Sequence, residues 1–194
     1  MPIPLGILAV AGAGAAGGGS AYDLLQTTLI TNNSTSSISF TSLGSFSAYK
    51  HLQLRGVIQT QRSSSTSDVG VLRFNGDTAT NYTWHWLTGN GSTVASQGFA
   101  TRAYARIEEV ATNATAATAF TPIVIDILDF SNTSKNKTVR MFFGHSITPG
   151  GSRVMQLASS VWMSTSAITS LSLDFTLSVN NYSAGSRLSL YGIK

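Results

Sequence analysis

Apolar and hydroxyl-bearing residues alternate along most of the chain after residue 20, in short runs separated by turn-forming residues. A period of two places successive side chains on opposite faces of a strand. In the stretch HLQLRGVIQ, Leu52, Leu54 and Ile58 are therefore expected on one face, and Gln53 and Arg55 on the other. The pattern predicts strands at 25–30, 37–40, 51–59, 69–74, 82–87, 103–110, 120–130, 138–145, 154–162, 168–177 and 187–193.

Clusters of Asn, Gly, Ser and Pro separate these runs, as is typical of turns between strands. The clearest are Asn75-Gly76-Asp77, Gly89-Asn90-Gly91-Ser92, Ser131-Asn132-Thr133-Ser134 and Pro149-Gly150-Gly151. Many short strands with regular turns and no convincing helical pattern predict an all-β fold, an antiparallel β-sandwich. We expect a jelly roll, formed by one domain over 21–194, with an extended N-terminal arm over 1–20.

The composition supports strands over helices. Ser and Thr together account for 51 of the 194 residues, while Asp, Glu, Lys and Arg make up 10%, against roughly 25% in an average soluble domain. Helix surfaces are normally rich in Glu, Lys, Arg and Gln, which are scarce here. The net charge of +4 is spread along the chain without a Lys/Arg run, so no nucleic-acid partner is expected.

The arm, MPIPLGILAVAGAGAAGGGS, contains no charged side chain. A signal peptide would carry a basic start, and a membrane span needs about 20 apolar residues, whereas strong apolarity here ends near Val10. A signal or membrane-associated segment and an inconsequential disordered tail remain alternatives, but we favour an arm that docks on a partner, with no membrane involved. The side chains expected to anchor it are Ile3, Leu5, Ile7, Leu8 and Val10.

The residue inventory limits catalysis. Without Cys there is no thiolate nucleophile or zinc finger, and no G-x-S-x-G motif occurs. The only glutamates, Glu108 and Glu109, are neighbours and would point to opposite faces of a regular strand, which argues against a paired-Glu site. We interpret the chain as non-enzymatic and expect no cofactor.

Histidine and aspartate spacing gives no metal or acid–base motif. His51, His85 and His145 fall in three different predicted strands, without a nearby ligand at metal-site spacing. Asp126 and Asp129 are three apart, hence on opposite faces of a regular strand. We expect ordinary structural roles for all five residues and no metal site.

Three aromatic residues share one face of a predicted strand: Tyr82, Trp84 and Trp86. Such a row is suited to a subunit interface or to the inner face of the sandwich, because aromatic side chains bury large areas. If exposed, it could instead stack on sugar rings and bind a host-surface glycan.

Several segments together resemble one known family of proteins. They are SISFTSL at 37–43, YKHLQLRGVIQ at 49–59, LRFNGDTATNYTWHWLTGNG at 72–91, IVIDILDFSNTSKNKTVR at 123–140, VWMSTSAITSLSL at 161–173 and RLSLYGIK at 187–194. With these segments the chain resembles small virion structural proteins of tailed bacteriophages, described as structural, decoration or fibre-like proteins. The resemblance implies a place in the virion, and it supplies no catalytic residues.

Three functions follow as hypotheses. The first is a capsid decoration or cement protein that docks through its arm on the major capsid protein or other virion proteins, and forms a homotrimer with copies of itself. The second keeps the virion but places the chain in the tail, as a fibre or baseplate component. The third is of a different class, a glycan-binding module for adhesion to a host surface.

Overall fold

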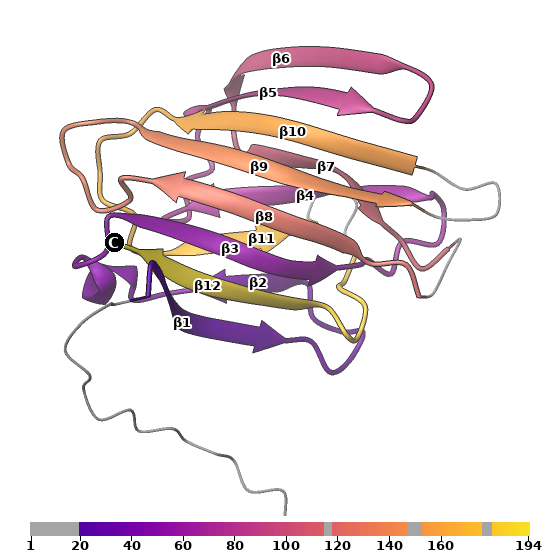
Figure 1. Cartoon of the computed structure of the whole chain (residues 1–194), viewed down its shortest axis with the longest axis horizontal. Helices are drawn as coiled ribbons and strands as arrows, with labels where there is room; N and C mark the ends of the chain where they lie inside the picture. Colours follow the sequence, from indigo (N-terminus) through magenta and orange to yellow (C-terminus); the bar gives the residue numbers. More distant parts are fainter. Residues whose placement is uncertain (1–19, 115–117, 147–152, 176–179) are drawn as a thin grey trace, which may run out of the picture.

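The computed structural model describes residues 20–114, 118–146, 153–175 and 180–194. These residues form two antiparallel sheets packed face to face, which confirms the predicted all-β sandwich (Figure 1). The described residues contain no α-helix, only the 3-10 turn η1 (Leu43–Phe46). The predicted arm lies almost wholly outside the described residues.

The larger sheet, sheet A, has eight strands and the smaller, sheet B, has four. In spatial order, sheet A contains β1 (Tyr22–Leu29), β12 (Arg187–Ile193), β3 (His51–Ile58), β8 (Thr121–Leu128), β9 (Lys137–Ser146), β10 (Arg153–Trp162), β5 (Tyr82–Gly89) and β6 (Val94–Arg102). Sheet B contains β2 (Ser37–Phe40), β11 (Leu171–Asp174), β4 (Ser67–Phe74) and β7 (Ala105–Ala111). In Figure 1, β1 lies at the bottom of sheet A and the β5–β6 hairpin at its top.

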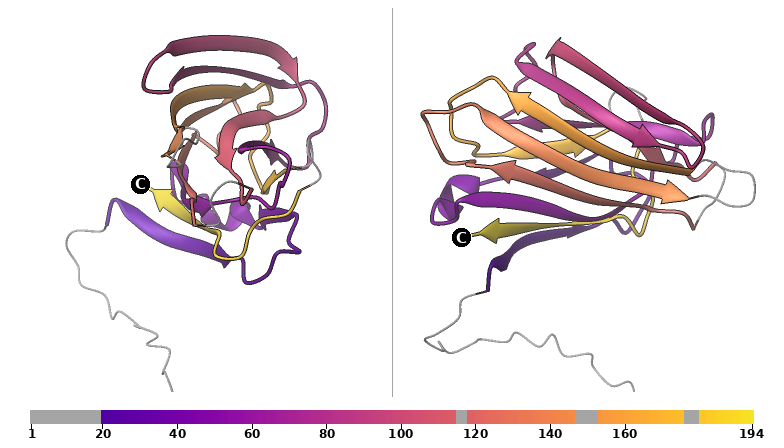
Figure 2. Two further views of the ribbon diagram at one scale, coloured as in Figure 1. Left: turned by 90° about the vertical axis from the view of Figure 1, so that its right-hand side faces the viewer. Right: turned by 45° about the horizontal axis from the view of Figure 1, so that its top comes forward.

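The core lies between the sheets and is built from alternate residues of each central strand. Leu52, Leu54 and Ile58 of β3 are buried there, as the sequence pattern predicts, and alternate isoleucines of β8 pack beside them. Sheet A has twice as many strands as sheet B, and its β5–β6 hairpin forms one end of this larger sheet (Figure 2).

One strand was missing from the sequence prediction, and another was predicted too long. Strand β6, with the sequence VASQGFATR, was not predicted, because an edge strand exposed along almost its whole length shows no apolar alternation. Only Phe99 in it is half-buried. Of the described part of the strand predicted at 168–177, only Leu171–Asp174 is a strand, and it pairs with both β2 and β4.

The predicted turn after β4 ties the two sheets together. Asn75 and Gly76 have φ of 52° and 67°, the pair of positive values that an Asn-Gly turn favours. The Asp77 amide donates to the Phe74 carbonyl over 2.9 Å. The Asp77 carboxylate then accepts a hydrogen bond of 2.7 Å from the indole of Trp162 in sheet A. The turn therefore anchors the end of β4 to β10.

Two buried phenols make stability sensitive to high pH. Burial raises the pKa of Tyr82 to about 12 and that of Tyr182 well above its usual value. In the unfolded chain both ionise near pH 10, so between about pH 10 and 12 the folded state holds protons that the unfolded state has lost. The free energy of unfolding should fall as pH rises through this range.

Urea denaturation at a series of pH values tests this expectation. Tyr82→Phe keeps the ring that packs on Phe74 and Trp162 but removes one of the two ionising groups, so its stability should decline less steeply with pH. Equal slopes for the variant and the unmodified chain would contradict the assignment.

Candidate functional site

Large apolar side chains cross four neighbouring strands on the outer face of sheet A, the face turned away from sheet B. Val124, Phe142, Leu157 and Leu87 are successive cross-strand partners on β8, β9, β10 and β5. Directly opposed residues in antiparallel strands share a face. Phe142, Leu157 and Leu87 retain 47%, 56% and 48% of their accessible surface. We call these four residues the apolar row.

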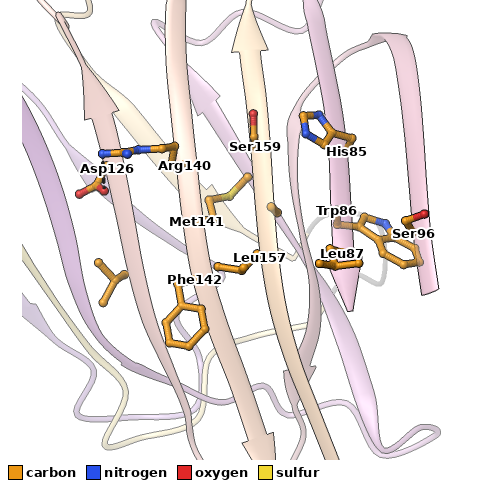
Figure 3. A pocket seen from close by; sticks show the side chains of 12 residues that line it. His85, Trp86, Leu87, Ser96, Asp126, Arg140, Met141, Phe142, Leu157 and Ser159 are labelled. Atoms are coloured by element: carbon orange, nitrogen blue, oxygen red, sulfur yellow. Dashed lines mark hydrogen bonds and ion pairs between the residues drawn. The ribbon is translucent and has the colours of Figure 1, made fainter. Parts of the chain in front are cut away.

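Two shallow hollows of about 510 Å³ each flank the apolar row. Figure 3 shows the first, with Leu87 and Leu157 on adjacent strands and Phe142 beside them. The second lies towards Met155, which is 61% exposed. Val124 and Phe142 line both hollows, so the row and the hollows form one continuous apolar surface.

A polar row runs beside the apolar row on the same face. Its members, in cross-strand register, are Gln53, Asp126, Arg140, Ser159 and His85. The Asp126 carboxylate accepts hydrogen bonds from Gln53 over 2.5 Å and from Arg140 over 3.3 Å, the latter visible in Figure 3. An apolar centre with a hydrogen-bonded polar border is the usual anatomy of a protein–protein interface.

The aromatic row of β5 faces the interior. Tyr82 and Trp84 are 0% and 3% exposed and Trp86 is half-buried. The alternative that these three residues form an exposed platform for stacking on sugars was therefore wrong. The Trp84 ring lies 4.4 Å from that of Phe99 and 5.3 Å from the guanidinium of Arg106, between ring centres and guanidinium carbon. The row therefore attaches the β5–β6 hairpin to β7 within the same chain.

The candidate acid and metal residues have structural partners. Asp126 belongs to the polar row, whereas Asp129 follows β8 and binds the Lys135 ammonium over 2.6 Å. That hydrogen bond is the main cause that lowers the pKa of Asp129. The Asp129 amide donates to Nδ1 of His51 over 2.9 Å. Within the described ranges no group of His, Asp and Glu side chains is arranged to hold a metal ion.

Strand β7 departs from regular geometry at its two glutamates. The pairing with β4 skips from Ile107 to Val110, and Glu109 has a φ of 57°, which marks a bulge. Glu108 and Glu109 both line one hollow between β5, β6, β7 and β10. The expectation that they would point to opposite faces assumed a regular strand and was wrong for this reason.

Sequence reasoning missed the apolar row. The signal was present in each strand separately, because β9 and β10 carry apolar residues on both faces. On β9, exposed Phe142 lies between buried Met141 and Phe143. On β10, exposed Leu157 points to the opposite face from buried Trp162. Which of them meet across strands depends on the register. The arm residues Ile3 to Val10 lie outside the described residues, so their predicted docking stays a prediction.

Comparison of the chain with protein-family models, curated proteins and solved structures found no match. The resemblance to phage structural proteins therefore remains a prediction from the sequence. No helix in the described ranges has the length and hydropathy needed to cross a membrane.

Proposed function

We propose that this protein is a non-enzymatic structural subunit of a tailed-phage particle, most specifically a capsid decoration protein that associates with copies of itself and with the major capsid protein. The apolar row is the observation that carries the proposal. Its sequence support is the resemblance of several segments to small virion structural proteins.

The apolar row favours association because its exposed apolar surface is hydrated in a monomer and stabilises the protein only when a partner buries it. Contiguous exposed apolar side chains on a folded domain typically mark a binding surface. Burying one large aliphatic side chain contributes about 1.5–3 kcal/mol. Three members of the row are about half exposed and therefore have surface left to bury on a partner.

The open edge of sheet A also favours a partner. Strand β6 is the last strand of the sheet, and its single charged residue is Arg102. Isolated β-proteins usually protect such an edge with Lys, Pro or a bulge that disrupts pairing. Strand β6 has neither Lys nor Pro, although its pairing with β5 is irregular near Trp84. A neighbouring subunit would cover it.

The jelly-roll topology is part of the proposal. If the inserted pairs β5–β6 and β9–β10 are set aside, the sheet orders become β1-β12-β3-β8 and β2-β11-β4-β7. Strands β1 to β4 then alternate between the two sheets, and β7, β8, β11 and β12 do the same. This alternation is what two Greek keys folded into a double-sheet jelly roll produce. We expect the assembled form to be a closed homotrimer.

The proposed docking arm is tested by deletion of residues 1–19. The described strands begin at Tyr22, so the shortened chain should keep its circular dichroism spectrum and melting temperature. It should fail to co-sediment with phage particles that lack the native protein, whereas the full chain should bind them. Binding by the shortened chain equal to that of the full chain would contradict arm-mediated docking.

A further inference from the structure

A polar hollow of about 430 Å³ lies at the opposite side of sheet A from the apolar row, beside the edge strand of sheet B. It lies between β5, β6, β7 and β10, and its volume is within the range of small-molecule pockets, roughly 300–1,000 Å³. The side chains that matter for its chemistry are Trp86, Gln97, Glu108, Arg153 and Gln156.

Strand register explains why these residues meet. On the inner face of sheet A, Trp86 is the cross-strand partner of Gln97, and Gln156 is the partner of Thr88 two residues further along β5. Sheet A continues beyond β7, the edge strand of sheet B. At Trp86 and Gln156 the inner face of these strands therefore opens into a hollow, whereas Tyr82 and Trp162 at the other end of β5 and β10 belong to the closed core.

Two buried polar atoms in this hollow have no hydrogen-bond partner among the described residues. Gln156 is only 1% exposed, and its Oε1 accepts no hydrogen bond. The Nε1 of Trp86 is also buried and donates none. An unpaired buried polar group is costly, and native structures leave few of them. An acceptor and a donor left open in one hollow indicate a ligand that can both donate and accept.

The charged residues of the hollow include both signs. Arg106 pairs with Glu108 through contacts of 2.5 and 3.0 Å, and burial raises the pKa of Glu108 although Arg106 acts in the opposite direction. Arg153 lies on the same hollow. A small ion of either sign would meet a like charge there, whereas a neutral polar ligand would not.

We propose that this hollow is a saccharide-binding site, with Gln156 and Trp86 as its central contacts. Each sugar hydroxyl is both donor and acceptor, so a saccharide carries both the donor that Gln156 Oε1 lacks and the acceptor that Trp86 Nε1 lacks. The site differs from the aromatic platform excluded above, because it uses the inner-face hollow beside the bulge of β7 and not an exposed row. Gln156 separates this site from the proposed assembly surface, because it lines only this hollow, whereas Trp86 also lines the first hollow beside the apolar row.

Saturation-transfer NMR of the full chain with glucose, galactose, mannose, rhamnose and N-acetylglucosamine tests the site, followed by titration of the sugar that gives the strongest signal. We expect at least one to bind. Gln156→Leu and Trp86→Phe should each weaken that binding by about tenfold, because each removes one buried hydrogen-bonding group. Gln26→Leu is the matched control, since Gln26 lies on β1 at the other edge of sheet A, and it should bind normally.

Gln156→Leu removes an acceptor that is unpaired in the free protein, so its melting temperature should not fall, and a folded variant with lost binding supports the site. Absence of binding by all five sugars to the folded chain would overturn the proposal. Unchanged affinity in both hollow variants would also overturn it. Selective binding of lysine amide in place of sugars would overturn it in favour of a cation site. Assembly of Gln156→Leu should be normal in every case.

Discussion

Replacing Leu157 by Asp should weaken the proposed self-association of the protein at least a hundredfold without unfolding it. Leu157 stands in the middle of the apolar row and is 56% exposed in the single chain. Just over half of its surface remains to be buried, so its burial on a partner is worth about half of the roughly 1.5–3 kcal/mol of a fully exposed leucine. A carboxylate in the same place would add the cost of being desolvated without a partner. A loss of about 2.7 kcal/mol corresponds to a hundredfold change in the dissociation constant.

Sedimentation velocity over a concentration series measures the effect, and a thermal melt of the same samples reports folding. The matched control is Leu29→Asp, because Leu29 is a 58% exposed leucine on the outer face of the same sheet but on its far edge strand. The control should associate normally. If Leu157→Asp associates like the unmodified chain, the apolar row is not the contact surface.

The largest stability effect is expected from Gly56→Ala. Gly56 lies on β3 opposite Leu188 of β12, in the interior of sheet A. An added Cβ would overlap the backbone carbonyl oxygen of Arg187 and lie 3.0 Å from the Cα of Leu188. Backbone atoms of a paired strand can move only if the pairing is disturbed. We expect a loss of about 3 kcal/mol in the free energy of unfolding, or roughly 6–12 °C in Tm.

Gly89→Ala provides the control on another strand of the same sheet. No atom lies within 4 Å of the Cβ that this substitution would add. Its melting temperature should therefore stay close to that of the unmodified chain, or rise slightly because alanine has fewer unfolded conformations than glycine. Equal losses in the two variants would mean that the close approach of β3 and β12 is not what requires glycine at Gly56.

The sequence predicted the core strands because each has one buried face and one face towards water. The alternation around Leu52 and Leu54 and the turn at Asn75-Gly76 are examples in which local pattern and tertiary structure agree. Strand β6 shows the converse. Its residues are exposed on both faces apart from Phe99, so its strand conformation depends on pairing with β5 and left no periodic signal.

The candidate surfaces could not be predicted in the same way. Val124, Phe142, Leu157 and Leu87 come from four strands and meet only through the register of those strands. Alternation placed Trp84 and Trp86 on one face, but it could not say that this face points inward. The bulge at Glu109, with its positive φ, brought two neighbouring glutamates to one hollow against the rule for regular strands.

The proposed virion role is tested most directly by quantitative mass spectrometry of purified phage particles whose genome carries this coding sequence. We expect the chain to be present in amounts comparable with the major capsid protein, with its N-terminal residues intact. Presence at the low copy number of tail components would move it to a fibre or baseplate. Absence from the particles would contradict a structural role in the virion.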